Sequence, residues 1–506
     1  MTLAIVYSRA SSGIVAPLVT VETHISYGMA GLNIVGLPEA AVKESKDRVR
    51  SALMNTSFEF PIRRITINLA PADLPKEGGR FDLPIALGIL AASGQLPIDK
   101  LMQHEFTGEL ALSGELRHVR GVLPMVLSAA KAQRNLIVPQ ANAAEAALVK
   151  RAQVFSAEHL LQVCAYLKGE DSLTICSRNA IANTAHSAEL DLSDVRGQPH
   201  AKRALEIAAA GKHSMLLMGP PGTGKTMLAS RLPTILPELE EDAALEVAAI
   251  ASISSNGFDP VKWQSLPFRA PHHTSSNVAL VGGGRPPRPG EISLAHHGVL
   301  FLDELPEFSR HVLESLREPL ESRQITISRA AFQTVFPAEF QLIAAMNPCP
   351  CGYAGNTRTL CRCTPQQLQR YLDKLSGPLL DRIDMQIEVP SLPPEILSSL
   401  PVDNARQSDV VKERVMAARL LQMKRQRKCN RDLSAADLPA FCPMDSDSKS
   451  LMNQVMNKFN LSARVYHRIV KVARTIADLA DQEAILIEHV SEALTYRCLD
   501  RLKISG

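Results

Sequence analysis

Apolar and polar residues alternate along two segments near the start of the chain, which predicts half-buried β-strands. The segments are residues 18–25, LVTVETHI, and residues 63–70, RRITINLA. Successive side chains of a strand point to opposite faces, so this alternation places one face against a core. Residues 40–56, AAVKESKDRVRSALMNT, have apolar residues at helical spacing instead. We therefore expect residues 1–168 to form a domain of mixed strands and helices.

The rest of the chain divides into three parts by the same criterion. A polar stretch without periodicity follows, and we assign residues 169–189 to a linker. Over residues 190–395, short apolar runs alternate with helical patterns and long loops, which is typical of a doubly wound parallel sheet. Over residues 396–506, strand signals vanish and helical periods dominate. The chain is thus expected to hold an α/β core followed by a helical C-terminal domain.

Composition places the chain among soluble globular proteins. Apolar residues make up 45% and charged residues 21% of the 506 residues. The formal net charge of +3 is close to neutral, so any nucleic-acid contact must be local. The first residues lack the basic and apolar regions of a signal peptide, and no apolar run approaches the roughly 18 residues that span a bilayer. We expect a cytoplasmic protein without a membrane partner, in which cysteines stay reduced.

A phosphate-binding pattern follows the apolar run at residues 215–218. Its residues are Gly219, Pro220, Pro221, Gly222, Thr223, Gly224, Lys225 and Thr226. Glycines let backbone N–H groups close on phosphates, and the helix that follows adds its partial positive charge. We expect Lys225 to reach the β- and γ-phosphates of ATP and Thr226 to ligate Mg²⁺. The strand before and the helix after make a coincidental Gly-rich turn a poor alternative.

Further polar residues fit a site for phosphoryl transfer to water. The run GVLFLDEL ends in Asp303 and Glu304. Asp303 fits the carboxylate on the Mg²⁺ side, and Glu304 the base that orients water. Asn347 ends another apolar run, FQLIAAMNP, where its amide would contact the γ-phosphate or the water. Arg382 and Arg464 supply positive charge for the γ-phosphate, although each taken alone could be an ordinary surface residue.

In order and spacing, these segments resemble an AAA+ ATPase of the magnesium-chelatase type. The stretch DVRGQPHAKRALEIAA resembles the segment that frames the adenine, and it contains Gln198. The resemblance implies that Asn347 is sensor 1, Arg382 the arginine finger and Arg464 sensor 2. It also implies a nucleotide-dependent homo-hexameric ring in which the finger reaches the ATP of a neighbouring subunit.

Two insertions resemble the hairpins that project toward the central pore in this family. The first, residues 268–298, contains GGGRPPRPG with Arg285 and Arg288. The second, SRQITISRAAFQTVFPAEF, contains Arg323 and Arg329. These four arginines are candidate contacts to DNA phosphates, and a surface loop is the alternative for the first segment. Its histidines at 272, 273, 296 and 297 more often face polar loops than bind a metal ion.

The N-terminal domain resembles the proteolytic domain of the Lon protease. The resemblance rests on GELALSGEL, residues 108–116, and on the turn PKEGGRFDLPIAL. It implies an α+β domain of the ribosomal S5 domain 2-like type. Arg80 aligns with the catalytic serine of the proteases and Leu123 with the lysine. A Ser–Lys dyad needs a hydroxyl and an amine, so we expect this fold without peptidase activity.

Four of the nine cysteines lie within the segment CPCGYAGNTRTLCRC: Cys349, Cys351, Cys361 and Cys363. A reducing compartment disfavours disulfides. The Cys-x-Cys spacing is tighter than the Cys-x-x-Cys of common structural zinc sites, but four thiolates around one Zn²⁺ remain feasible. A structural zinc ion and unligated loop thiols are therefore both open.

The segment KERVMAARLLQMKRQRKCNR, residues 412–431, has eight basic residues and one acidic residue. A solvated charged helix explains this composition, and binding of DNA phosphates is the alternative. Aromatic residues make up only 4% of the chain, so a stacking platform for single strands is not indicated.

The order of a Lon-like domain, a chelatase-type AAA+ core and a helical lid resembles the competence-related ComM/YifB group. That resemblance implies a hexameric DNA motor that acts on single-stranded or branched DNA and drives branch migration during recombination of incoming DNA. The alternative is a chelatase-like ATPase that remodels a partner protein for metal insertion. We take the N-terminal domain as the feature that separates the two, because chelatase motor subunits are expected to lack it. A binding module without turnover is disfavoured by the Asp303–Glu304 pair.

Overall fold

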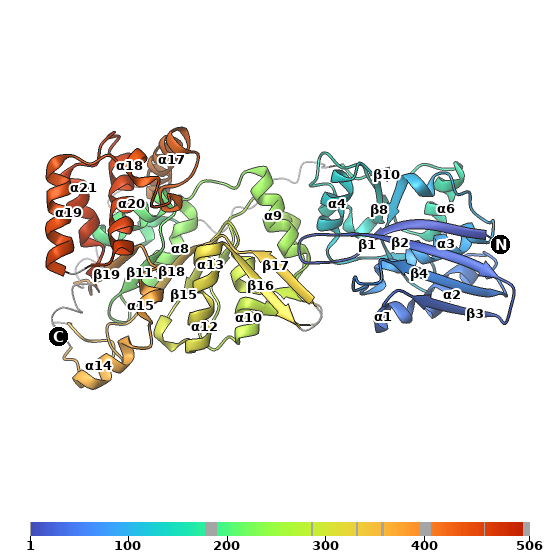
Figure 1. Cartoon of the computed structure of the whole chain (residues 1–506), viewed down its shortest axis with the longest axis horizontal. Helices are drawn as coiled ribbons and strands as arrows, with labels where there is room; N and C mark the ends of the chain where they lie inside the picture. Colours follow the sequence, from blue (N-terminus) through green and yellow to red (C-terminus); the bar gives the residue numbers. More distant parts are fainter. Residues whose placement is uncertain are drawn as a thin grey trace.

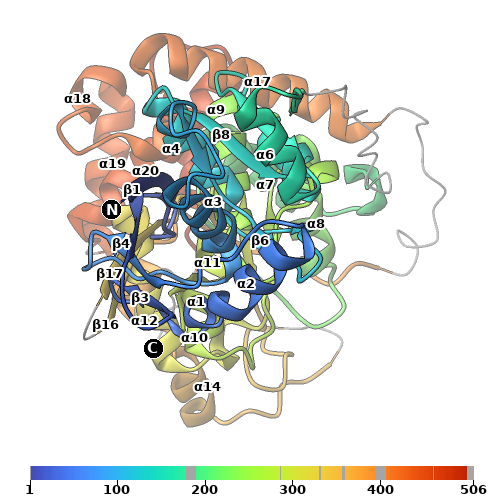
Figure 2. The ribbon, with the colours of Figure 1, turned by 90° about the vertical axis from the view of Figure 1, so that its right-hand side faces the viewer.

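The computed structural model describes residues 2–177, 190–284, 287–329, 332–355, 359–393, 406–459 and 461–498. The chain is elongated, with an N-terminal module at one end, a central α/β core, and C-terminal helices at the other end (Figure 1). Viewed along the long axis, the N-terminal module lies in front of the core (Figure 2). Within these ranges, no helix is both long and apolar enough to cross a lipid bilayer.

A single sheet forms the N-terminal module. Its strands are β1 (Thr2–Arg9), β2 (Leu18–Ser26), β3 (Gly31–Val35), β4 (Arg64–Ala70), β5 (His104–Phe106), β8 (Asn135–Pro139), β9 (Val154–Ala157) and β10 (Thr174–Ile175). They follow the order β10-β9-β8-β5-β1-β2-β4-β3. The two strands expected from alternating residues are β2 and β4, which pair antiparallel, so that prediction is confirmed. Every second residue of β2 is buried, as the alternation requires.

Helices cover this sheet. They are α1 (Ala40–Lys43), α2 (Ser45–Asn55), α3 (Asp82–Ala92), α4 (Val122–Lys131), α5 (Ala143–Ala146) and α6 (Leu160–Lys168). Every residue of α3 is buried, because this helix is apolar on all sides and lies between the sheet and α2. The helix expected over residues 40–56 is present, but it is divided at Glu44 into α1 and α2. A short hairpin, β6 (Glu109–Leu110) and β7 (Leu116–Arg117), occupies the GELALSGEL segment.

The sheet of the N-terminal module extends beyond residue 168. Thr174 and Ile175 of β10 pair antiparallel with β9. These residues fall in the segment that we assigned to the linker, and residues 178–189 of that segment lie outside the described residues.

The central core is built on a five-stranded parallel sheet, as the alternating pattern predicted. Its strands are β11 (Met215–Met218), β12 (Phe268–Arg269), β15 (Val299–Leu302), β18 (Gln341–Met346) and β19 (Met385–Glu388), in the order β12-β15-β18-β11-β19. All neighbours are parallel. Met215 and Leu217 pack into the apolar core on one face, and Leu216 and Met218 into the core on the other face. Both faces are therefore covered, as parallel sheets require.

Helices and two hairpins surround this sheet. The helices are α7 (Pro199–Gly211), α8 (Lys225–Ile235), α9 (Glu241–Ser252), α10 (Asn277–Val281), α11 (Glu291–Leu294), α12 (Arg310–Ser315), α13 (Arg317–Ser322), α14 (Pro365–Leu372) and α15 (Gly377–Leu380). The first hairpin pairs β13 (Gly282–Gly283) with β14 (Arg288–Pro289). The second pairs β16 (Gln324–Arg329) with β17 (Phe332–Pro337). Both insertions predicted from the sequence thus contain a hairpin.

The C-terminal part, described over residues 406–459 and 461–498, consists mainly of helices joined by loops. Its helices are α17 (Gln407–Gln426), α18 (Leu438–Phe441), α19 (Ser446–Phe459), α20 (Ala463–Leu479) and α21 (Ile487–Thr495). Val411, Val415 and Ala418 of α17 belong to the same apolar core as Ala204 and Ala208 of α7. The C-terminal helices therefore share one continuous core with a face of the central sheet.

The N-terminal module and the central core are packed together through α4 and α9. Val122 and Val126 share a core with Leu245, Ala249 and other apolar residues of the α9 side. The amide of Gly121 donates to the carbonyl of Ser252 over 3.1 Å. This interface fixes the two bodies relative to each other in the structure.

Candidate functional site

The loop between β11 and α8 requires glycine at three positions. Gly222 and Gly224 have φ values of +79° and +85°, the left-handed region that glycine adopts without strain. A Cβ atom at Gly219 would lie 2.2 Å from the carbonyl oxygen of Val389, so only glycine fits there. These three glycines therefore allow the loop to fold tightly at the start of α8, with its backbone N–H groups on the inside.

Lys225 is a buried cation whose described partners are all neutral. Its Nζ donates to the carbonyl oxygens of Gly219 and Pro220 over 2.6 Å and 2.8 Å, and to Oδ1 of Asn347 over 3.2 Å. The side chain is 8% exposed, and burial lowers its pKa. The charges of Asp303 and Glu304 offset part of this effect. Because the hydrogen bonds of Lys225 among the described residues go to neutral oxygens, the site favours an anionic ligand such as a phosphate group.

Two oxygen ligands suited to Mg²⁺ meet beside this lysine. Thr226 Oγ1 donates to Oδ2 of Asp303 over 2.7 Å, although the two residues are 77 positions apart. Thr226 starts α8 and Asp303 follows β15, so the carboxyl edge of the sheet brings them together. Hydroxyl and carboxylate oxygens are the donors that Mg²⁺ prefers, and the pair lies next to the phosphate-binding loop.

Glu304 has a strained backbone and a histidine partner. Its φ is +51°, in the left-handed region that a residue with a side chain adopts at an energetic cost. Its Oε2 lies 3.0 Å from Nδ1 of His273, which belongs to the loop after β12. The sequence analysis missed this role of His273. Its only signal was a histidine pair in a loop, and such a pair does not reveal a partner 31 positions away.

Asn347 and Gln198 lie at the two flanks of the phosphate-binding loop. Asn347 follows β18, the neighbour of β11, and contacts Lys225 as described above. Gln198 precedes α7 and donates from Nε2 to the carbonyl of Pro390 over 2.7 Å. Pro390 is next to Val389, against which Gly219 packs. The structure therefore brings the predicted residues of the loop, the two carboxylates, Asn347 and Gln198 to one edge of the sheet.

Arg382 lies at the opposite edge of the same sheet. It precedes β19, whereas Lys225 follows β11, and these two strands are parallel neighbours. Because each strand has four residues and rises about 13 Å, Arg382 cannot reach the phosphate-binding loop of its own chain. Its guanidinium is 2.6 Å from Oε1 of Glu321 and donates to the carbonyl of Pro378 over 2.7 Å.

Further basic residues gather at this amino edge. A polar cavity of about 240 Å³ is lined by Lys212, Arg323, Arg382, Arg431, Arg468 and Lys471, together with acidic residues. Arg468 of α20 pairs with Asp384, the residue before β19. Burial would raise the pKa of Asp384, but the charge of Arg468 and a hydrogen bond with His213 outweigh it and hold that pKa well below its usual range.

Arg464 is exposed and lies one turn before Arg468 on the same face of α20. The predicted residues of the nucleotide site thus form two separate groups within one chain. The phosphate-binding half occupies the carboxyl edge, and the arginines lie toward the amino edge.

The four arginines predicted to contact DNA have different positions. Arg323 lies at the base of the second hairpin, where it donates to Asp432 over 2.7 Å and lines the cavity that contains Arg382. Arg288 lines a cavity between the two modules and donates to Ser255 over 3.3 Å. Within one chain these two arginines line different cavities, and their contact with DNA in a central pore stays a prediction. Arg285 and the side chain of Arg329 lie outside the described residues.

Both hairpins lie against the N-terminal module. The cavity lined by Arg288 has a volume of about 740 Å³ and also includes Thr334 of β17 and Arg80. A Cβ atom at Gly13 would lie 2.9 Å from Cγ2 of Thr334. In this cavity burial raises the pKa of Glu77 to about 7. The hairpins therefore line a boundary between modules in the single chain.

Arg80 and Leu123, at the positions of the protease dyad, carry neither a hydroxyl nor an amine. Arg80 donates from Nη2 to the carbonyl of Arg120 over 3.3 Å, close to the start of α4. Leu123 is fully buried in α4. The expected lack of peptidase activity stays a prediction, because it depends on our alignment of these two residues with the dyad.

The basic segment at residues 412–431 is largely used in packing of the lid. Arg425 pairs with Asp478 over 2.6 Å, and Lys428 with Asp437 over 2.6 Å. Arg419 donates to the carbonyl of Ala209. These contacts favour the structural explanation of the basic segment over a free DNA-binding face.

Two histidines of the first insertion share a carboxylate. Nε2 of His296 and Nε2 of His297 lie 3.1 Å and 2.9 Å from Oε2 of Glu246. The three groups are close enough to hold a metal ion, but the distances are those of ordinary hydrogen bonds. Burial lowers the pKa of His296 to about 4, so this histidine is neutral at pH 7.

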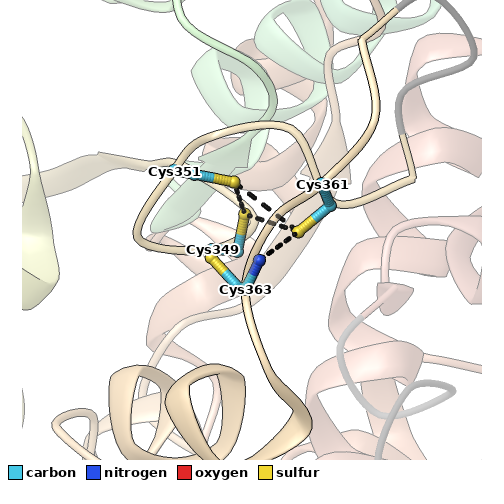
Figure 3. Close-up of side chains that lie close together, drawn as sticks. All are labelled: Cys349, Cys351, Cys361 and Cys363. Atoms are coloured by element: carbon cyan, nitrogen blue, oxygen red, sulfur yellow. Dashed lines mark hydrogen bonds between the residues drawn. The ribbon is translucent and has the colours of Figure 1, made fainter.

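The four clustered cysteines are brought together by the loop between β18 and α14 (Figure 3). Their sulfur atoms lie within 4.8 Å of one another and could hold a metal ion. None of the nine cysteines is in a disulfide. This cluster packs beside the phosphate-binding loop, because a Cβ atom at Gly352 would lie 2.7 Å from Cδ of Pro221.

Comparison with known proteins places these features in a family. The family described as "Magnesium chelatase, subunit ChlI" matches residues 191–397, and "Magnesium chelatase, subunit ChlI C-terminal" matches residues 405–497. The chain is 53% identical over 505 residues to "Competence protein ComM" of Haemophilus influenzae, covering 99% of each chain. It is 52% identical to "Uncharacterized protein YifB" of Salmonella typhimurium, covering 100% of this chain and 99% of the relative.

Two further matches are partial. "Lon protease 2" of Bacillus subtilis is 27% identical over 182 residues, which are 31% of this chain and 32% of that protein. The family described as "Subunit ChlI of Mg-chelatase" matches residues 21–142. We had expected the N-terminal module to distinguish a DNA motor from a chelatase-like remodeller. Because a chelatase family description also covers this region, the module alone does not distinguish them.

Proposed function

The chain belongs to the ComM/YifB group of magnesium-chelatase-like proteins, and on this basis we propose that it is an ATP-driven DNA motor. The proposed motor is a homo-hexamer of AAA+ ATPase subunits that migrates branched DNA during recombination of incoming DNA. One observation carries the proposal: the phosphate-binding half of the site and the arginine half lie at opposite edges of one sheet.

ATP and Mg²⁺ are the proposed cofactors, and the residues at the carboxyl edge fit them. The backbone of the loop and Lys225 would hold the phosphates, because that buried cation has only neutral partners among its described contacts. Thr226 and Asp303 would ligate Mg²⁺, whose charge would stabilise the oxygens of the transferred phosphoryl group. Gln198 would lie near the adenine.

Glu304 would accept a proton from the attacking water, and Asn347 would orient that water or the γ-phosphate. His273 would position the carboxylate of Glu304, which it contacts over 3.0 Å. A carboxylate on a strained backbone that is held from the side is pre-oriented for this role.

The position of the arginines supports the proposed ring. A subunit with one half-site at each edge completes both only when neighbours stack head to tail, and a rotation that closes gives a ring. Arg382 would be supplied to the ATP of the adjacent subunit, with Arg464 beside it. Release of Arg382 from Glu321 is then a requirement for activity, since the two are paired in the single chain.

DNA is the proposed substrate because a full-length relative is named a competence protein. The proposed DNA-contacting residues are Arg285, Arg329 and, if the modules separate, Arg288. We propose a cytoplasmic location, where incoming DNA recombines. A chelatase-like remodeller is the second candidate, and it is supported by the three chelatase family matches.

The experiment that tests the proposal is ATP hydrolysis by the purified chain with and without three-way and four-way DNA junctions. The motor predicts stimulation by junctions and binding that weakens steeply as salt increases, because phosphate contacts release counterions. Glu304→Gln is the matched control, since it should bind DNA and ATP without turnover. Absence of any DNA response with Mg-ATP would contradict the motor and favour the remodeller.

A further inference from the structure

The loop that carries the four cysteines runs from β18, which ends next to Asn347, to α14. Cys349 and Cys351 follow Asn347 at the end of β18, and Cys361 and Cys363 immediately precede the N-cap of α14. Figure 3 shows the four side chains turned toward one another.

Distances between the sulfur atoms decide which chemistry the cluster fits. Cys349 Sγ lies 3.3 Å from Cys351 Sγ and 3.6 Å from Cys361 Sγ, and the last two are 3.6 Å apart. A disulfide needs about 2.05 Å. Four sulfurs at about 2.3 Å from a tetrahedral Zn²⁺ are separated by about 3.8 Å. The arrangement is therefore close to that of a tetrahedral zinc site and far from that of a disulfide.

Backbone N–H groups are directed at the sulfurs. The amide of Ala354 donates to Sγ of Cys349 over 3.2 Å, and the amide of Cys363 donates to Sγ of Cys361 over 3.4 Å. Such donors stabilise thiolates and orient them around a metal ion.

Apolar packing contributes little to the order of this loop. Cys349 is buried, but Leu360 is 87% exposed, and the described residues between β18 and α14 form neither a helix nor a strand. A loop with so small a core needs a covalent or metal cross-link to hold one conformation.

The loop also contacts the phosphate-binding loop directly. A side chain does not fit at position 352, because a Cβ atom there would clash with Cδ of Pro221 at 2.7 Å. The same Cβ position lies 3.9 Å from Cγ of Asn347, which is ordinary van der Waals contact. The φ of Gly352 is +85°, and its amide donates to the carbonyl of Cys349 over 2.9 Å in a tight turn. The turn from Cys349 to Gly352 therefore packs against Pro221 through Gly352.

We propose that Cys349, Cys351, Cys361 and Cys363 bind one Zn²⁺ as four thiolates, and that this ion fixes Gly352 against Pro221. The site is closed, with four protein ligands and no open position, so the role of the ion is structural. Nucleotide affinity then depends on zinc through the shape of the phosphate-binding loop. This second part rests on the proposed ATP site, whereas zinc binding does not.

The first test measures metal content. The full-length chain, purified without chelator, should contain about one zinc per chain by elemental analysis. The double variant Cys361→Ser/Cys363→Ser should lose it, and Cys176→Ser, outside the cluster, should keep it. After chelation, Co²⁺ added to the wild-type chain should give the absorption bands of a tetrahedral thiolate site. Wild-type protein with under about 0.2 zinc per chain and no such bands would overturn the proposal.

The second test separates coupling from metal binding. Gly352→Ala keeps all four ligands, and Gly355→Ala is its matched control, because Gly355 also has a positive φ, +75°, but nothing within 4 Å of its Cβ position. Both variants should retain zinc. Gly352→Ala should weaken binding of a fluorescent ADP analogue about tenfold, as a small displacement of a positioned group typically does. Equal affinities in the two variants would refute the coupling.

The outcomes also separate this inference from the proposed motor. A chain that contains zinc and loses nucleotide affinity in Gly352→Ala, but does not respond to DNA junctions, refutes the motor alone. A chain that responds to junctions but contains no zinc refutes the metal site alone.

Discussion

Arg382 and Lys225 lie at opposite edges of one parallel sheet, and this separation can be tested by mixing two inactive variants. Arg382→Ala removes the arginine and keeps Glu304, whereas Glu304→Gln removes the base and keeps the arginine. If each site takes its base from one subunit and its arginine from the next, each variant alone should hydrolyse ATP at least about 1,000-fold more slowly than wild type.

The recovery expected on mixing follows from the geometry. Consider a ring assembled at random from equal amounts of the two variants. A site is complete when an Arg382→Ala subunit supplies Glu304 and the adjacent subunit is a Glu304→Gln variant that supplies Arg382. Each condition holds for half of the positions, so about one quarter of the sites are complete and about one quarter of wild-type activity returns. If the arginine acted within its own chain, no site would contain both groups and mixing would recover nothing.

The assay is steady-state ATP hydrolysis on a junction, with the two variants mixed before nucleotide is added. The loss of the Arg382–Glu321 pair should cost only about 1 kcal/mol, because Glu321 is half exposed and can be solvated. Arg117→Ala, an exposed arginine of the N-terminal module, controls for charge removal and should leave activity unchanged. Full activity of Arg382→Ala alone, or an inactive mixture of well-assembled rings, would refute the shared site.

Three further outcomes are expected. His273→Ala should lower kcat about tenfold with little change in KM for ATP, because it releases the carboxylate of Glu304. His272→Ala is the control and should leave kcat unchanged. Equal effects of the two variants on kcat would contradict the positioning role of His273. Burial raises the pKa of Glu77 to about 7, so the folded state disfavours its charged form and stability is lost as pH rises through that value. Glu77→Gln should therefore raise the unfolding free energy at about pH 8 by about 1–2 kcal/mol after solvent screening, and little at about pH 4, as measured by thermal unfolding. Lys225→Met should abolish binding of a fluorescent ATP analogue. The melting temperature of this variant should equal or exceed that of the wild type, because a desolvated cation is removed. A lower melting temperature would mean that Lys225 stabilises the protein in the absence of nucleotide.

The sequence was sufficient where function depends on local order along the chain. Gly219 to Thr226 form the predicted turn between a strand and a helix, and the alternating runs at residues 18–25 and 63–70 are strands. Period and spacing encode these features directly, because each depends on residues only a few positions apart.

The sequence was insufficient where partners are distant. The pairing of Arg323 with Asp432, 109 positions away, and of His273 with Glu304 depends on which strand edges and helices meet in the fold. A basic residue in a loop gives the same local signal whether it faces DNA or an acidic side chain. For the same reason, the basic composition of residues 412–431 did not reveal that α17 uses its charges against the core.

The shared apolar core of α7 and α17 determines where the polypeptide can be shortened. A fragment that stopped at residue 395 would expose Ala204, Ala208 and their neighbours to water, since the side chains that cover them come from Val411, Val415 and Ala418. Such a fragment should aggregate or unfold however intact its nucleotide motifs are. Recombinant fragments intended for crystals or binding assays therefore need to retain α17 to α21, and those that keep α9 also need the N-terminal module that covers Leu245 and Ala249.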